Sequence, residues 1–406
     1  MKVLVIGKVY PEPLSSAAGT RTMGLIDAFL TVNWSVTFTT TAEPTEHSDD
    51  LLKKGVSTRK SQVNDDAFDH WVRSLAPNFV VFDRYMTEEQ FGWRIEKACP
   101  DTLRILDTID LHCLREAREQ QLKHGGNLNL FNDVALREIA AIFRSDLSWI
   151  ISEFEIECLQ SVFQVPATQL SYLPLMLDSP LPSTSTFEDR KDFVMIGNYL
   201  HAPNWDAVHW CCDQIWPIIR QQLPDAALHL YGSYEPEKVR QLENAANGIY
   251  FCGRAEESMK TLGRYRVNLA PLRFGAGQKG KVADGFCSGT PTVVTPIAAE
   301  SMNGPIDWGC LIHADAPGLA QTAVELYTKP DLWKTVQHQG YRIVKDRFLA
   351  KEWAPSLIEQ LKSLTTENRK NHFVGQMLRH HHHRSTEYMS RWIEAKNRFN
   401  YEKSKR

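Results

Sequence analysis

The chain has 406 residues, 43% of them hydrophobic, and a formal net charge of −3 at pH 7. This length exceeds the usual ~100–200 residues of one domain, so we expect two domains and an appendage. No stretch approaches the ~18–20 uncharged apolar residues of a membrane-spanning helix, and the eight cysteines form no CxxC pair or zinc-finger spacing. We therefore expect a cytoplasmic protein with reduced thiols and no metal site.

The first part of the chain alternates between predicted strands and helices. Residues 3–6 form an apolar run that is typical of a strand buried in a parallel sheet. A loop at 11–21 and a helix at 22–30 follow. The alternation predicts right-handed βαβ units and a parallel sheet. Further strands are expected at 34–40, 78–83, 103–107 and 148–151, an irregular segment at 41–63, and helices at 67–75, 87–99 (capped by Thr87), 133–143 (capped by Asp133) and 152–159.

A second alternating series follows a boundary rich in proline, serine, threonine and charge. Strands are expected at 193–198, 227–231, 249–252, 267–270, 293–294 and 310–313, and helices at 203–222 (kinked at Pro217), 235–246, 258–265, 318–327, 331–348 and 353–364. The predicted divisions are a first domain at 1–177, a linker at 178–190, a second domain at 191–345, a closing helix at 346–364 and a basic helical tail at 365–406.

A glycine-rich turn at 273–284 connects a strand to a helix in the second domain. Its glycines allow backbone N–H groups to approach an anion, and the helix N-terminus adds about half a positive charge. The turn also carries three cations, which suits a diphosphate; the alternative is a turn that needs glycine for its backbone angles alone. The predicted diphosphate contacts are Arg273, Gly275, Gly277, Lys279 and Lys281.

The tail differs in charge from the rest of the chain. Residues 363–406 contain ten Lys/Arg and four Asp/Glu, a net of +6, which leaves −9 for residues 1–362. Four histidines at 380–383 suggest a metal site, but successive helical residues point ~100° apart and cannot all reach one ion, which favours a solvated basic helix. The tail could pack on the acidic body, on another subunit or on an anionic membrane. Its apolar patches are Phe373, Val374, Met377 and Leu378, and Tyr388, Met389, Trp392 and Ile393.

Together these features resemble the GT-B glycosyltransferases. The second half is similar to the donor-binding domain of the retaining family 4, or "glycosyl transferases group 1", over about residues 190–350; the similarity is looser over 1–175 and absent from the tail. The resemblance implies two Rossmann-like, doubly wound parallel-sheet domains that face a central cleft. The stretches that carry it are 193–198, 228–232, 251–254, 269–273 and 284–291.

The resemblance also implies roles for individual residues. Asp284 replaces a family glutamate that holds the ribose, whereas Ala276 replaces the glutamate that holds the donor sugar. Glu300 is a candidate for that missing sugar contact. Phe251, Gly253 and Arg254 would flank the nucleoside, Ala18 and Gly19 would form the cleft loop of the first domain, and His112 and Lys279 would be catalytic.

The implied activity is retaining, metal-independent transfer from a nucleotide sugar, without a cofactor. The leaving phosphate would take the acceptor's proton in a front-face reaction. The acceptor, a glycan, lipid or protein, stays open, as do the base and sugar of the donor. Nucleic acid is not expected as a partner, and peripheral membrane contact through the tail stays open. The alternatives are a non-catalytic sugar-nucleotide-binding or scaffold protein and a GT-B sugar-nucleotide epimerase.

Overall fold

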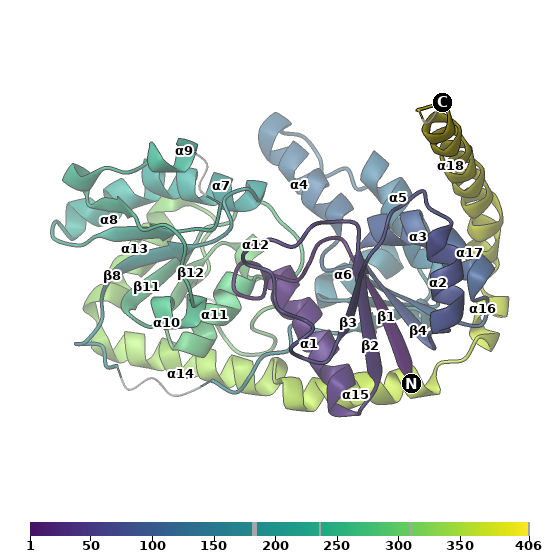
Figure 1. The fold of residues 1–406 in the computed structure, drawn as a ribbon. Helices are drawn as coiled ribbons and strands as arrows, with labels where there is room; N and C mark the ends of the chain where they lie inside the picture. Colours follow the sequence, from purple (N-terminus) through teal and green to yellow (C-terminus); the bar gives the residue numbers. More distant parts are fainter. Residues whose placement is uncertain (181–184, 235–236, 309–310, 405–406) are drawn as a thin grey trace.

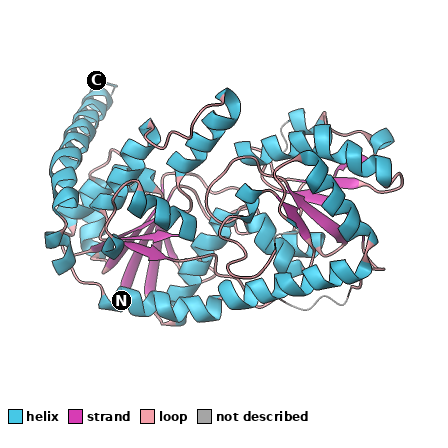
Figure 2. Cartoon of the chain, turned by 180° about the vertical axis from the view of Figure 1, so that it is seen from behind, coloured by secondary structure: helices cyan, strands magenta, loops and turns pink. Residues whose placement is uncertain are grey.

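The computed structural model describes residues 1–180, 185–234, 237–308 and 311–404. Two α/β units lie side by side, each with a parallel sheet between helices (Figure 1). The same arrangement is visible from behind, where long C-terminal helices run beneath both units and the last helix rises along the outer side of the first (Figure 2).

The first unit contains a seven-stranded sheet in the order β3-β2-β1-β4-β5-β6-β7, and every neighbouring pair is parallel. The expected parallel sheet is thus confirmed. Its strands are β1 Lys2–Gly7, β2 Ser35–Thr40, β3 Ser57–Lys60, β4 Phe79–Asp83, β5 Leu103–Asp107, β6 Leu147–Ile150 and β7 Leu170–Tyr172; its helices are α1 Ala17–Thr31, α2 Ala67–Leu75, α3 Tyr85–Ala98, α4 His112–His124, α5 Asp133–Arg144 and α6 Glu153–Ser161.

The second unit contains a five-stranded parallel sheet in the order β10-β9-β8-β11-β12. A π-helical turn at Cys211–Ile215 interrupts the helix expected at 203–222, just before Pro217. The strands are β8 Lys191–Ile196, β9 Leu228–Tyr231, β10 Ile249–Phe251, β11 Tyr265–Ala270 and β12 Thr292–Val294; the helices are α7 Ala202–Trp210, α8 Trp216–Gln222, α9 Glu237–Arg240, α10 Ser258–Leu262, α11 Gly280–Ser288, α12 Pro296–Ala299 and α13 Ala316–Thr328.

The chain crosses between the units twice, and the two crossings are joined. Helix α14 (Pro330–Arg347) belongs to the second unit, whereas α15 (Ala350–Ser363) returns to the first and buries Leu357, Ile358 and Leu361 in its core. The Leu177 N–H donates to the Phe348 carbonyl at 2.7 Å, and the Leu177 carbonyl accepts from Ala350 at 2.8 Å. Within the predicted linker, residues 181–184 lie outside the described residues.

Several local predictions were wrong. Helix α3 begins at Tyr85, so Thr87 lies inside it and its hydroxyl donates to the Asp83 carbonyl at 3.1 Å. The side chain of Asn132, rather than Asp133, caps α5 by accepting from the Ala135 N–H at 3.0 Å. The irregular segment at 41–63 contains β3, a polar edge strand without the alternation that signals a buried face.

The helices expected at 22–30 and 235–246 also have different bounds. Helix α1 begins at Ala17 because Ser16 caps it, which places Ala18 and Gly19 in its first turn and not in a loop. Only Glu237–Arg240 is helical in the second segment, whose first two residues, 235 and 236, are not described. In the strand expected at 310–313, Ile312 makes a single parallel bridge to Val294, and Cys310 lies outside the described residues.

The tail packs on the outer side of the first unit, against α3 and α5, which agrees with packing on the acidic body (Figure 1). Of its histidines, His383 is buried against Glu88 and Glu96, whereas His380 is exposed. The described residues contain no group of three or more His, Cys, Asp or Glu side chains placed to hold a metal, and none of their helices could cross a membrane. The tail comprises α16 Glu367–Asn371, α17 Phe373–Leu378, a π-helical turn Arg379–His383 and α18 Arg384–Ser404.

Candidate functional site

A cleft of about 1810 Å³ lies between the two units. Segments that follow β1, β4 and β5 line it on one side, and segments that follow β8, β9 and β11 line it on the other. The cleft therefore lies at the carboxyl ends of both parallel sheets, which is where open α/β sheets bind ligands.

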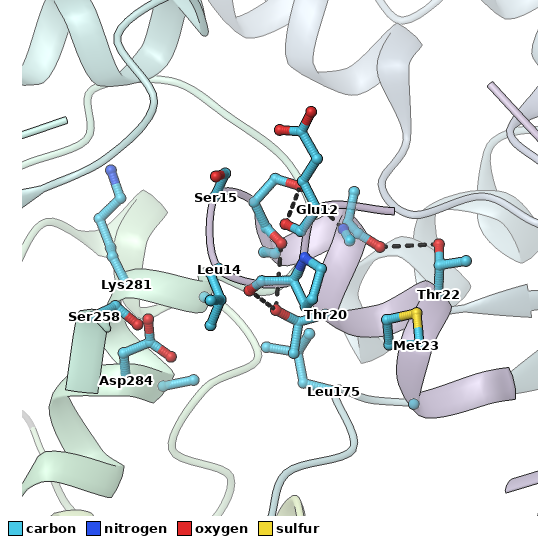
Figure 3. A pocket seen from close by; sticks show the side chains of 18 of the residues that line it. Glu12, Leu14, Ser15, Thr20, Thr22, Met23, Leu175, Ser258, Lys281 and Asp284 are labelled. Atoms are coloured by element: carbon cyan, nitrogen blue, oxygen red, sulfur yellow. Dashed lines mark hydrogen bonds between the residues drawn. The ribbon is translucent and has the colours of Figure 1, made fainter. Parts of the chain in front are cut away.

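Helices α1 and α11 begin at this cleft from opposite sides. A Cβ atom at Gly280, the first residue of α11, would lie 2.7 Å from the Ala17 Cβ in the first turn of α1. Figure 3 shows Glu12, Leu14 and Ser15 of the segment before α1, and Thr20 of its first turns, opposite Lys281 and Asp284. A side chain at position 280 would thus collide with the other unit, so glycine is required for the approach of the two helices.

The N-terminus of α11 has no capping side chain. Within the described part of the chain, the N–H groups of Gly280 and Lys281 donate to no protein acceptor. By contrast, the Ser16 Oγ caps α1 and accepts from the Gly19 N–H at 3.0 Å. Unpaired N–H groups and the helix dipole make the start of α11 suitable for an anion.

Two lysines bring positive charge to the same end of α11, and both line the cleft. The Lys279 ammonium is buried and donates to the Gly277 carbonyl, and burial lowers its pKa. The Lys281 ammonium donates to the Asn204 Oδ1, and burial together with the charge of Lys279 lowers its pKa to about 7. Burial has removed water from both ammonium groups, and neither forms an ion pair within 4.0 Å among the described residues, although Glu300 and Glu155 partly offset the charge of Lys279. A bound anion would compensate the remaining positive charge.

Asp284 lies one turn into α11 and faces the same cleft (Figure 3). Burial raises the pKa of its carboxyl to about 6, and a hydrogen bond with Ser258 at the start of α10 opposes the rise. The carboxyl is therefore mostly ionised at pH 7 and can accept hydrogen bonds from hydroxyl groups.

His112 approaches the cleft from the first unit, at the start of α4. Its Nδ1 lies 3.1 Å from the Asp110 carbonyl and 3.2 Å from the Glu138 Oε1. The Glu138 carboxylate also accepts from the His112 N–H at 3.0 Å and from the Cys113 N–H at 2.9 Å. A buried carboxylate thus fixes the orientation of the imidazole.

Gly277 makes a contact that differs from the predicted one. Its N–H donates to the Glu155 Oε1 at 2.7 Å, and the same oxygen accepts from the Leu111 N–H at 3.0 Å. Gly277 has φ +66°, and a Cβ there would lie 2.8 Å from the Asp110 Cβ. The Glu155 carboxyl of the first unit therefore accepts from the N–H group that we expected to face the diphosphate. Burial raises the pKa of this carboxyl.

The structure brings some of the predicted site residues together and places others elsewhere. Arg273 pairs with Asp206 of α7, in the same unit, at 2.9 Å. Glu300 accepts from Arg118 of α4 at 3.0 Å, and this contact joins the two units. Ala18, Gly19, His112, Gly275, Lys279, Lys281 and Asp284 line the cleft, whereas Phe251, Gly253, Arg254, Arg273, Gly277 and Glu300 are not among its lining residues.

Sequence reasoning missed several polar groups of the cleft. His201 lies in the turn after β8, and burial and the charge of Arg115 lower its pKa to about 4. Burial opposes ionisation of Asp110, but Arg115 and His112 outweigh it and hold the pKa of Asp110 well below its usual range. The turn after β8, which leads into Asn204 in the first turn of α7, could have been found from its position at the carboxyl end of a parallel strand.

Residues 190–329 match the family model described as Glycosyl transferases group 1. A search of curated proteins gave no significant match. Among solved structures, sucrose-phosphate synthase from Thermosynechococcus elongatus has a TM-score of 0.70 at 15% identity, covering 89% of this chain and 98% of that one.

Two further structures are similar over comparable lengths. HepE from Anabaena, in complex with UDP and glucose, has a TM-score of 0.66 at 13% identity and covers 90% of this chain and 100% of its own. A glycosyltransferase from Rickettsia africae has a TM-score of 0.65 at 11% identity, with coverages of 91% and 99%. The predicted resemblance is thus confirmed: the chain has the GT-B fold of glycosyltransferases, and its residues 190–329 match the group 1 family.

Proposed function

We propose that the protein is a glycosyltransferase that takes its sugar from a nucleotide-sugar donor. The observation that carries the proposal is the uncapped N-terminus of α11, with Lys279 and Lys281 beside it in the interdomain cleft. The family match over residues 190–329 supports the same activity. The structurally similar HepE binds UDP and glucose, which makes UDP-sugars the first donors to test.

The donor diphosphate is assigned to the N–H groups of Gly280 and Lys281 and to the two lysine ammonium groups. The Asp284 carboxylate, less than one helical turn further along α11, would then accept from the ribose hydroxyls. Ala276 supplies no carboxylate for the donor sugar, and its methyl group packs with the core residues of the first unit. The sugar would therefore lie toward Asp110 and His112 on the opposite wall.

The proposed reaction retains the configuration at the sugar and needs no metal. The bond between the sugar C1 and the phosphate oxygen breaks as the acceptor oxygen bonds to C1 on the same face. The acceptor's hydroxyl proton passes to the leaving phosphate oxygen. Lys279, Lys281 and the α11 N–H groups stabilise the negative charge that develops on the leaving diphosphate.

The test combines binding with turnover. Calorimetry with a panel of nucleotide sugars, starting with UDP-glucose, identifies the donor, and a coupled assay of nucleotide release reports transfer or slow hydrolysis. Binding followed by release supports the proposal. Binding without release, with any acceptor offered, would favour a non-catalytic binding protein, and failure of every nucleotide sugar to bind would contradict both.

A second candidate is a sugar-nucleotide epimerase of the same fold. Asp83, Asp110 and His112 all line the first-unit wall of the cleft, and an epimerase needs acid and base groups of this kind around the sugar. Product analysis separates the two: an epimerase converts one nucleotide sugar, or its hydrolysis product, into a stereoisomer without an acceptor, whereas a transferase needs one for full turnover.

Binding of the nucleotide should take up protons. At pH 8 the Lys281 ammonium, with a pKa of about 7, is mostly neutral, and a bound diphosphate raises this pKa. We expect uptake of about one proton per UDP bound at pH 8 from Lys281, and a further fraction from Lys279, whose pKa burial also lowers. Calorimetry of UDP binding in two buffers of different ionisation enthalpy measures it.

The matched control for this measurement is Lys281→Arg. Its guanidinium is charged before binding, so UDP should still bind while the uptake falls. Equal binding enthalpies of the wild type in the two buffers would refute the prediction.

A further inference from the structure

We propose a second anion-binding site, between the tail and the outer side of the first unit, that takes a phosphate group. A cavity of about 460 Å³ lies there and shares no lining residue with the interdomain cleft. Six lysine or arginine side chains and only two glutamates line it. Such an excess of positive charge around a cavity is suited to an anion.

The main evidence for this site is the buried side chain of Arg104, in β5. Its side chain is 3% exposed and lines the cavity, yet its Nε and Nη1 have no hydrogen-bond partner in the described part of the chain. The nearest carboxylate oxygens are the Glu96 Oε2 at 3.5 Å from Nη1 and the Asp146 Oδ2 at 3.9 Å from Nε. Two buried guanidinium nitrogens without hydrogen bonds are costly, so a ligand in the cavity would explain their retention.

The two nearby carboxylates already have closer partners. Asp146 accepts from Arg369 at 2.7 and 2.6 Å and from the Arg104 N–H at 2.8 Å. Glu96 accepts from His383 of the tail. The positive charge of Arg104 therefore remains poorly compensated.

Other cations crowd the same cavity. Burial and the charge of Arg104 lower the pKa of Arg379 to about 10. Lys370 and Arg384 lie exposed in its lining and form no ion pair with any described residue. Arginine forks match the oxygen geometry of phosphate, and a phosphate here would relieve the repulsion among these side chains.

A phosphate can come from an acidic lipid or from a free anion, and the outer face of α18 favours the lipid. Tyr388, Met389, Trp392 and Phe399 are exposed there, from about one turn beyond Arg384 for Tyr388 to about four turns for Phe399. Two of the three glutamates of the helix instead face the body, where Glu387 bonds Lys97 and Glu394 bonds Arg94, whereas Glu402 is exposed. A cationic pocket beside exposed aromatic side chains suits the headgroup and the upper acyl region of an anionic membrane.

The test uses the full chain with Lys281→Gln as the background, which weakens the anion site of the cleft and separates this proposal from the proposed function. Inorganic phosphate should raise the melting temperature of the background protein by a few degrees. Arg104→Met should remove that rise, and so should the double variant Lys370→Gln/Arg384→Gln, whose exposed positions keep the fold intact. Persistence of the rise in the double variant, or its absence from the background protein, would overturn the site.

Vesicles identify the source of the phosphate. Sedimentation with phosphatidylcholine vesicles that contain phosphatidylglycerol, but not with phosphatidylcholine alone, supports the lipid headgroup when the double variant loses it. A phosphate-induced rise without vesicle binding supports the site with a free phosphate compound as its ligand. Vesicle binding that survives in the double variant, together with no phosphate-induced rise, would contradict the proposal.

Discussion

Replacing Lys279 with alanine should lower kcat/KM for sugar transfer by about 10²–10³-fold, which corresponds to about 3–4 kcal/mol of lost transition-state stabilisation. The Lys279 ammonium lies in the cleft at the start of α11, where the leaving diphosphate is assigned. Because burial lowers its pKa, the charge is costly to keep there without an anion, and its removal should leave the melting temperature nearly unchanged. Steady-state kinetics with the identified donor measure the effect.

Arg273→Ala is the matched control because it removes a cation from the same glycine-rich turn. Arg273 does not line the cleft and is paired with Asp206, partly exposed to solvent. Because Arg273 makes no contact in the cleft, kcat/KM should change by less than about fivefold, and loss of the partly exposed ion pair should cost about 0–1 kcal/mol of stability. Equal losses in both variants would show that the charge of the turn acts as a whole, and full activity of Lys279→Ala would remove Lys279 from the reaction.

The fold could be predicted because alternation of short apolar strands with helices is a local property. The apolar run at residues 3–6 indicates a strand buried on both faces, and parallel order follows from the helices that separate the strands. The errors lie where tertiary contacts decide. The polar strand β3 exists because it pairs with β2, and no residue within 57–60 signals that partner.

The candidate site could be predicted only where its chemistry is contained in one segment. The start of α11 carries its glycine, its lysines and Asp284 within a few residues, so the sequence indicates an anion site. Arg273 belongs to the same segment, but its orientation depends on Asp206, which is 67 residues away. Glu300 is likewise held by Arg118, which lies 182 residues earlier.

Gly277 shows how one signal can have two causes. A glycine at φ +66° was expected to bring an N–H group to a phosphate, and its N–H instead binds Glu155 of the first unit. The close approach to Asp110 also requires glycine. Contact between the two units therefore explains why position 277 is glycine. The sequence had suggested donor binding as the reason.

The location of the tail depends on buried partners that are scattered through the first unit. Its net charge of +6 favoured an acidic surface without identifying one. The contacts include Arg94 with Ser390 at 2.9 Å and Arg369 with Asp146 at 2.7 Å. These pairs join residues more than 200 positions apart, so no local pattern reveals them.

Replacing Glu88 with alanine should lower the free energy of unfolding by about 3–5 kcal/mol, because it removes one partner of a buried ion pair. The Glu88 carboxylate accepts from the Arg144 Nε at 3.0 Å with each oxygen and lies 3.3 Å from the Nε2 of His383 in the tail. Both Glu88 and Arg144 are buried, so the variant would leave the guanidinium without its counter-ion. Urea denaturation followed by tryptophan fluorescence measures the loss.

The adjacent Glu89→Ala is the matched control. Glu89 also pairs with an arginine of α5, but Arg137 is 53% exposed, so this change should cost no more than about 1 kcal/mol.

The two variants should also differ in pH dependence. Burial raises the pKa of Glu88, but Arg144 and His383 outweigh it and hold the value at about 2 in the folded protein, against 4.5 for a free glutamate. Since the folded-state pKa is depressed, the stabilisation is complete above pH 4.5 and is lost as the pH falls toward 2. The gap between wild type and Glu88→Ala should therefore narrow over that range, and equal losses in the two variants at neutral pH would contradict the assignment.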